Sequence, residues 1–535
     1  MGRYAAQHAD LPPAHSWSSR RFVFVGVLLV IAGGLAVVGA IYAAAAVSGG
    51  GEPEAVLLPA PTPTATPTQT PTPPPVPTAT PLPTPTPTPT PYQGWVDPAS
   101  VGAPYGTEVE GLLTFRGNPT RTYYGQGPVP SSPSIQWVYP DSTTMCGPTT
   151  LGGEVESWCG TGWTGQPAVV GWEDATWTVF GAYDHRVHFV DAESGQRLLD
   201  PFPTNDIIKG SVTIDPDGYP LVYSGSRDDR FHIIAVDRDQ PVELWSLAAD
   251  DVPGSLWNND WDGSALVLDD YLFEGGENSV LHIVKLNRAY DSDGLVTVDP
   301  ELVFTAPGYD AELREKVGSN VSIENSVAIS GDTIYFANSG GLVQGWDLSG
   351  LDAGEEPTRV FRYWAGDDVD ASVVVDEDGY LYVGVEYERA TARSADVGQL
   401  IKLDPSAPDP LLWSVFDTAR LPDGLWATPA VPRDLVSAGT DSGRLLGVDR
   451  ETGEIRWEIP MPEHVWSSAV VVDDVLIQAD CNGTVRALDV SDTDVEPPEL
   501  WRVNLGSCIE STPAVWDGRI IVGARGGQVY MLADD

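Results

Sequence analysis

The chain has 535 residues and a formal net charge of −47, from 29 basic and 76 acidic side chains. A surface with this excess of carboxylates repels phosphate, which argues against nucleic acid as a partner and against direct binding to anionic lipid. The length would allow several domains, but one repeat occupies most of the chain and predicts a single large core.

An apolar run without charges extends over residues 22–47. It exceeds the roughly 20 residues that a helix needs to cross about 30 Å of hydrocarbon, and so predicts one transmembrane helix. Arg20 and Arg21 precede the run and acidic side chains follow it, so the positive-inside rule predicts a cytoplasmic tail at residues 1–21. The rest of the chain then lies outside the cell membrane. Small residues at the end of the run leave a cleaved signal peptide as the alternative.

Residues 48–94 are predicted to form an extracellular stalk. Proline and threonine alternate through most of them, as in PTPTATPTQTPTPPP, and no apolar face is available for burial. Such a sequence favours an extended, semi-rigid conformation, which would hold the following domain away from the membrane.

Residues 95–535 contain a segment that recurs eight times after residue 160. Each copy has an apolar strand, a turn, a second strand, a Gly-rich turn and a third strand that usually ends in Asp. In four copies a position just before the first strand is followed by glycine seventeen residues later, in the pairs Glu324–Gly341, Trp426–Gly443, Trp466–Gly483 and Glu510–Gly527. The repeat predicts an all-β fold, an eight-bladed β-propeller.

The eighth copy has no fourth strand, because the chain ends at Asp535. The segment SIQWVYP around Trp137, upstream of the first complete copy, can supply it by pairing with GQVYML. That pairing would close the ring and remove its exposed sheet edges.

The four cysteines form an even set in a chain that is predicted to face an oxidising exterior. Three connectivities are possible. We favour Cys146 with Cys159, which are close in sequence, and Cys481 with Cys508, which lie in loops expected on one face of the propeller. Both disulfides are expected to be structural.

The innermost strand of each blade begins at one mouth of the central channel. The equivalent positions in the eight copies are Thr164, Lys209, Asp262, Glu324, Asp370, Trp426, Trp466 and Glu510. Four of the eight are acidic, where the composition predicts about one, so we expect Asp262, Glu324, Asp370 and Glu510 to bind Ca²⁺ or a cationic ligand, beside Lys209. Trp426, Trp466 and Trp261 could offer flat faces to a sugar, a quinone or an ammonium group. The alternative is that the acids are solvated rim residues and the tryptophans plug the channel.

Residues 429–459, PAVPRDLVSAGTDSGRLLGVDRETGEIRWEI, resemble the repeats of the pyrroloquinoline quinone (PQQ)-like β-propeller superfamily, also called quinoprotein alcohol dehydrogenase-like. In that superfamily the tryptophan of each repeat docks between blades, and a lead-in similar to FRGNPTRT wraps the outside of the ring. The resemblance implies either a quinoprotein dehydrogenase, with PQQ and calcium in the funnel, or a non-enzymatic scaffold. The chain has no adjacent cysteine pair and no CxxCH haem motif, which argues against PQQ and a self-sufficient dehydrogenase.

The sequence thus predicts a membrane-anchored extracellular propeller that acts as a binding or scaffold module for an envelope protein or carbohydrate. One alternative is an enzyme with its site in the funnel, either a PQQ- and calcium-dependent dehydrogenase or an enzyme acting on envelope carbohydrate. Another is a sensor or scaffold for a second membrane protein.

Overall fold

The computed structural model describes residues 92–535, except for residues 107, 152, 164, 173 and 417–423. The predicted cytoplasmic tail, the transmembrane helix and nearly all of the stalk lie outside the described residues, so these assignments stay predictions. Within the described part of the chain, no helix is both long and apolar enough to cross a membrane.

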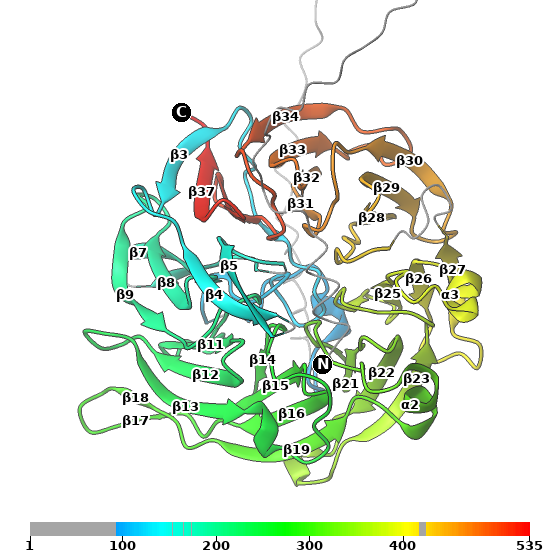
Figure 1. Cartoon of the computed structure of the whole chain (residues 1–535), viewed down its shortest axis with the longest axis horizontal. Coiled ribbons are helices and arrows are strands. Elements are labelled where there is room, and N and C mark those ends of the chain that lie inside the picture. The colour runs from blue at the N-terminus through cyan, green and yellow to red at the C-terminus, as the bar shows by residue number, and fades with distance from the viewer. Residues whose placement is uncertain (1–91, 107, 152, 164, 173, 417–423) are drawn as a thin grey trace, which may run out of the picture. The chain divides into compact units, whose positions relative to one another are not determined.

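Eight antiparallel sheets surround a central axis, which confirms the predicted all-β, eight-bladed propeller (Figure 1). Blade 1 contains β6 (Ala168–Trp172), β7 (Ala175–Ala182), β8 (Arg186–Asp191) and β9 (Arg197–Pro203). Blade 2 contains β10 (Thr213–Ile214), β11 (Leu221–Gly225), β12 (Arg230–Ala235) and β13 (Val242–Ala248). Blade 3 contains β14 (Leu266–Leu268), β15 (Tyr271–Gly276), β16 (Val280–Lys285) and β19 (Glu301–Pro307). Blade 4 contains β20 (Ala328–Ser330), β21 (Thr333–Phe336), β22 (Leu342–Asp347) and β23 (Thr358–Trp364).

The second half of the ring repeats this pattern. Blade 5 contains β24 (Val374–Val375), β25 (Leu381–Gly384), β26 (Leu400–Leu403) and β27 (Leu411–Val415). Blade 6 contains β28 (Leu435–Thr440), β29 (Arg444–Asp449) and β30 (Ile455–Pro460), with a bridge between Ala430 and Ser437 at its inner edge. Blade 7 contains β31 (Val470–Val472), β32 (Val475–Ala479), β33 (Thr484–Asp489) and β34 (Glu499–Asn504). Blade 8 contains β35 (Ala514–Trp516), β36 (Arg519–Ala524), β37 (Gln528–Ala533) and β3 (Ser134–Tyr139).

The remaining elements lie in the N-terminal segment or in connections between blades or strands. They are β1 (Gly111–Leu112), β2 (Gly125–Gln126), the hairpins β4 (Cys146–Leu151) with β5 (Glu154–Cys159) and β17 (Ala289–Tyr290) with β18 (Val296–Thr297), the helices α2 (Ala311–Val317) and α3 (Ala392–Val397), and three short 3₁₀ turns, Pro98–Ser100, Ala249–Asp251 and Leu351–Ala353. The apolar core lies between facing sheets. One cluster, for example, joins Ile477 and Val485 of blade 7 to Val515 and Val522 of blade 8.

The ring is closed as the sequence predicts. Strand β3 pairs antiparallel with β37, and Trp137 lies opposite Met531. The indole of Trp137 also donates to the carbonyl of Ala192 in blade 1, at 3.1 Å. Its ring covers Gly195, where φ is +70° and an added Cβ would lie 2.7 Å from the indole. This contact confirms that the tryptophan of the repeat docks between blades, and it shows why the following turn requires glycine.

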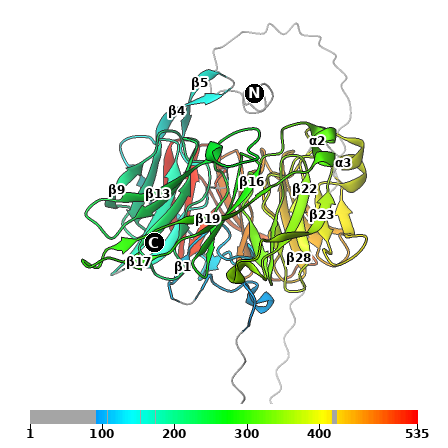
Figure 2. The ribbon, with the colours of Figure 1, turned by 90° about the horizontal axis from the view of Figure 1, so that it is seen from below.

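Both predicted disulfides are formed, Cys146–Cys159 and Cys481–Cys508. The first closes the base of the β4–β5 hairpin, which rises above one face of the ring (Figure 2). The second joins the turn after β32 to the loop that leads into β35.

A belt of side-chain hydroxyls connects the inner ends of the blades. In each contact the backbone N–H of one blade donates to the hydroxyl of the equivalent residue in the next. The five bonds run from Gln166 to Ser211, Ser264 to Ser326, Ser326 to Ser372, Ser372 to Thr428 and Thr428 to Ser468, at 2.9–3.0 Å. Each belt residue lies two positions after a predicted mouth position, so the register of Lys209, Asp262, Glu324, Asp370, Trp426 and Trp466 is confirmed. Position 164 itself lies outside the described residues.

The N-terminal segment Leu112–Gln126 lies inside the ring, so the expectation that FRGNPTRT wraps the outside is wrong. It begins by pairing β1 with β6 and ends with β2 beside β35. Between them, Arg121 donates to the carbonyls of Val327 and Ser264 at 2.8 Å, and Arg116 donates to those of Pro429 and Ala469. The two buried guanidinium groups satisfy inner-strand carbonyls that a closed channel would otherwise leave without donors. We call this segment the arm.

Candidate functional site

One face of the ring brings two kinds of segment together, the loop that leads into the innermost strand of each blade and the turn between the second and third strands of the same blade. Backbone hydrogen bonds join them, as from Glu277 to Asp260 at 3.0 Å and from Glu386 to Asp368 at 2.8 Å. The same face carries the β4–β5 hairpin, since Tyr183 in the first such turn donates to Gly160. We call this face the mouth. The predicted site positions that the structure describes belong to it.

The first group of charges at the mouth surrounds the ammonium of Lys209. Its Nζ lies 3.1 Å from Glu277 Oε1 and 3.9 Å from Asp260 Oδ2, and it also pairs with Asp262. Arg227 Nε lies 2.7 Å from Asp260 Oδ2. Burial alone would lower the pKa of Lys209, but the surrounding carboxylates hold it well above its usual value. We call Lys209, Asp260, Asp262 and Glu277 the lysine cluster.

Glu324 extends the lysine cluster toward the next blade. Its carboxylate lies in one compact group with those of Asp262 and Glu277. The hydroxyls of Ser322 and Ser339 donate to its Oε1 at 2.6 and 2.9 Å. Burial, reinforced by the charge of Glu277, raises the pKa of Glu324 to about 7.

A second group of carboxylates forms where blade 5 meets this face. Asp368, Asp370 and Glu386 place one oxygen each within 4.8 Å of the others. We call these three residues the acidic cluster. Burial raises the pKa of Asp368 to about 7 and that of Glu386 well above its usual value.

The structure thus divides the four predicted metal ligands. Asp262 and Glu324 belong to one group and Asp370 to another. Glu510 is instead paired with Arg525, whose Nη1 lies 2.8 and 3.0 Å from its two carboxylate oxygens. The guanidinium of Arg525 in turn covers the rings of Trp158 and Tyr183, each at 5.0 Å. The expectation of one four-carboxylate site is therefore replaced by two smaller groups and an ion pair.

The predicted aromatic residues have two different positions. Trp426 and Trp466 stack on one another at the mouth, with ring centroids 4.9 Å apart, and Trp163 packs edge-on against Trp426. Trp261 is fully buried in the core, against the rings of Phe231 and His282. It offers no face to a ligand, so the predicted role for Trp261 is wrong.

The predicted site positions include neither Asp260 and Asp368, which precede Asp262 and Asp370 by two residues, nor the charged residues in the turns between second and third strands. Glu277 and Arg525 come directly after the second strand of their blade, and Arg227 and Glu386 follow β11 and β25 by two residues. The repeat register could have located these residues, because it places the turns between second and third strands as well as the beginnings of the first strands. Charged residues recur in those turns.

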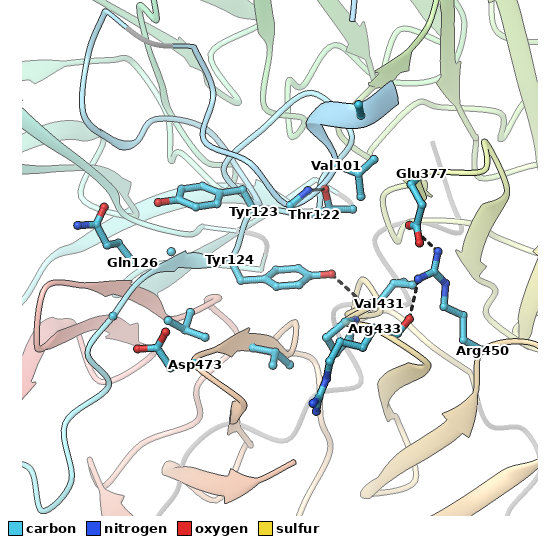
Figure 3. Close-up of a pocket in the computed structure, with 17 residues that line it drawn as sticks. Val101, Thr122, Tyr123, Tyr124, Gln126, Glu377, Val431, Arg433, Arg450 and Asp473 are labelled. Carbon is cyan, nitrogen blue, oxygen red and sulfur yellow. Dashed lines mark hydrogen bonds and ion pairs between the residues drawn. The ribbon is translucent and has the colours of Figure 1, made fainter. Parts of the chain in front are cut away.

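A hollow of about 660 Å³ lies at the opposite face, where the arm meets the turns between first and second strands (Figure 3). Its polar groups bond to one another. The backbone N–H of Val431 donates to the hydroxyl of Tyr124 at 2.7 Å, and Arg450 pairs with Glu377 at 2.6 Å. None of the predicted site residues lines this hollow.

Comparisons with known proteins agree with this architecture. A family profile described as outer membrane protein assembly factor BamB matches residues 398–533. The quinohemoprotein alcohol dehydrogenase of Comamonas testosteroni superposes with a TM-score of 0.51 at 13% identity, over 79% of this chain and 80% of that one. These repeats are of the PQQ-like type. The resemblance read from the sequence is confirmed, and at this identity the structural likeness shows the fold alone.

Two further solved structures are similar at lower scores. BamB from Moraxella catarrhalis gives a TM-score of 0.46 at 17% identity, over 69% of this chain and 94% of that one. The computationally designed Ika8 protein gives 0.49 at 14% identity, over 70% and 99%. Among curated proteins, no sequence matches this chain.

The residues at the mouth do not fit PQQ. This quinone is a planar tricarboxylate, and the mouth would meet it with the carboxylates of both clusters. Lys209 is already paired with three carboxylates. Trp426 and Trp466 are in stacking contact with each other, at the separation expected of two neighbouring rings, so no third ring fits between them.

Proposed function

We propose that this chain is a single-pass membrane protein whose propeller lies outside the cell and serves as a binding or scaffold module for an envelope protein or carbohydrate. The apolar run at residues 22–47 and the arginines before it support the anchoring and its orientation. The two disulfides, which use all four cysteines, suit an oxidising exterior.

One observation carries the choice of a binding module over an enzyme in the funnel. The centre of the ring is filled by the chain's own groups. From one side, Arg116 and Arg121 of the arm bond to inner-strand carbonyls. From the other side, Lys209 and its carboxylates are buried together. A partner as large as a sugar or a protein would therefore be recognised on the surface of the mouth, and the β4–β5 hairpin is the element that projects furthest there (Figure 2).

The hairpin offers a direct test in intact cells. Val155 is 73% exposed on β5, whereas Val360 is 58% exposed on β23, an outermost strand. We expect a cysteine at position 155 to react with a membrane-impermeant maleimide, and a photo-crosslinker there to give a discrete product that the same crosslinker at position 360 does not give. Labelling only after lysis would contradict the exterior location. Identical products at both positions would contradict a binding surface at the mouth.

The enzyme alternative has a separate test. After incubation with PQQ and Ca²⁺, followed by desalting, we expect the full-length protein to keep no quinone absorbance. Stoichiometric retention of the chromophore would favour a quinoprotein dehydrogenase instead.

A further inference from the structure

The acidic cluster is built by two segments that hydrogen bonds hold in place. Asp368 and Asp370 lie in the loop that leads into β24, and Glu386 follows β25. The backbone N–H of Glu386 donates to the carbonyl of Asp368 at 2.8 Å, which fixes one segment against the other. The three carboxylates are therefore brought together by the fold and not by flexible side chains alone.

The charges around this cluster do not balance. The nearby acids are Asp367, Asp368, Asp370, Glu386 and Glu388, and the cation among them is Arg389. Arg389 is directed to one side, since its Nη1 lies 3.3 Å from Asp368 Oδ2 and its backbone N–H donates to Asp367 Oδ1 at 3.0 Å. The hydroxyl of Ser394 also donates a hydrogen bond to Asp367 Oδ2 at 3.1 Å. Asp370 and Glu386 have no ion pair in the described part of the chain.

Each member of the cluster also has an oxygen without a donor. Asp368 Oδ1, Asp370 Oδ1 and Glu386 Oε1 are shielded from solvent, and no described residue outside the cluster donates a hydrogen bond to them; these oxygens have only the carboxyls of the cluster itself as partners. Asp368 is 4% exposed and Glu386 is 2% exposed, while Asp370 is half-buried. Buried carboxylate oxygens in proteins are nearly always paired, because an unpaired one costs free energy. Three together point to a bound group that supplies positive charge.

We propose that Asp368, Asp370 and Glu386 bind a divalent cation, and that calcium is the ion that suits them. Calcium bonds oxygen at 2.3–2.6 Å, so two oxygens on one ion lie at most about 5 Å apart, and the three carboxylates offer oxygens within 4.8 Å of one another. Its irregular coordination, with six to eight oxygens, leaves room for waters on the half-buried side at Asp370.

The lysine cluster provides an internal precedent. Asp262, Glu277 and Glu324 form a group of the same size, and there the chain places its own ammonium, Lys209, between the carboxylates. The acidic cluster has the corresponding carboxylates without a lysine. This inference goes beyond the proposed function, because it concerns an ion and not the partner of the propeller.

Ion binding can be measured on the full-length protein in detergent after metals are removed with a chelator. We expect calcium titration calorimetry to show one saturable ion per chain, and terbium, used as a calcium probe, to show luminescence excited through tryptophan. Asp370→Asn and Glu386→Gln should each weaken calcium binding by at least about tenfold, since each removes a ligand charge. Asp378→Asn is the matched control, because Asp378 is an exposed acid in the β24–β25 turn of the same blade.

The absence of saturable binding in the wild-type protein would overturn the proposal, as would equal affinities in the wild type and Asp370→Asn. If circular dichroism shows that one variant does not fold, the other variant decides. A melting curve supplies an independent measurement, because an ion that binds the folded chain raises its stability with concentration. A wild-type melting temperature that millimolar calcium leaves unchanged would contradict the site without any variant.

Discussion

The lysine cluster and the acidic cluster occupy the same face of one propeller and differ in one respect. In the first, Lys209 lies among Asp260, Asp262 and Glu277, and the charges are compensated within the chain. In the second, three carboxylates meet without a lysine, and the nearby Arg389 reaches only one of them. The repeat supplies the geometry in both places. Where a repeat position carries a lysine, the chain itself neutralises the carboxylates around it. Where the position carries another carboxylate, the group can bind a cation.

Removal of Lys209 from the lysine cluster should have the largest effect on the stability of the protein. Lys209→Met leaves buried carboxylates without their cation, which typically costs about 3–5 kcal/mol of unfolding free energy. The measurement is chemical denaturation followed by tryptophan fluorescence. Lys316→Met is the control, because the Lys316 side chain is 37% exposed and pairs with Glu312 at 3.7 Å across one helical turn. Its loss should cost less than about 0.5 kcal/mol.

The same variant also tests whether the two clusters are alike once the lysine is gone. Calcium should restore part of the stability that Lys209→Met loses, since the ion replaces the missing charge, and should not affect Lys316→Met differently from the wild type. A loss below about 1 kcal/mol for Lys209→Met would show that the carboxylates around it do not need an ammonium.

Neutralising one carboxylate in each cluster should change the stability of the metal-free protein, measured in the presence of a chelator, in opposite directions. Asp262→Asn removes a partner of Lys209 and should destabilise the fold by about 2 kcal/mol. Asp370→Asn relieves repulsion from Glu386 and should stabilise the metal-free protein by about 1 kcal/mol. Thermal unfolding of the two variants in the same buffer measures the difference. Changes of the same sign would mean that the clusters are not electrostatically distinct.

The sequence predicted those parts of the site that follow the repeat. Counting from one copy to the next located Lys209, Asp262, Glu324 and Asp370, because each lies two residues before a hydroxyl of the inter-blade belt. The closing strand around Trp137 was also predictable, since the eighth copy lacks its own fourth strand.

Some parts that the sequence did not predict depend on contacts between copies. Glu277 approaches Glu324 because the turn of one blade meets the loop leading into the next, and a register within single copies does not describe that contact. Glu386 meets Asp370 within one copy, but the long insertion with α3 between β25 and β26 obscured its position. The arm belongs to no repeat, and its buried Arg116 and Arg121 both have positive φ, which no sequence pattern indicates for arginine.

A further expected effect concerns Arg389, the cation that the acidic cluster does have. Its guanidinium lies 3.3 Å from Asp368 Oδ2 and repels an ion bound to the same carboxylate. Arg389→Gln should therefore tighten calcium binding by about tenfold, which corresponds to about 1.4 kcal/mol, and the gain should shrink as salt is added. Calorimetry at two ionic strengths measures both.

Arg393→Gln is the matched control for that variant. Arg393 lies in α3 four residues further along the chain, but its guanidinium faces Tyr363 and the carbonyl of Trp364 and not the acidic cluster. Its removal should change calcium affinity less than about twofold, because the lost charge is more distant. If Arg389→Gln instead weakens calcium binding, then Arg389 holds Asp368 in position as a ligand, and the acidic cluster resembles the lysine cluster more closely than its charges indicate.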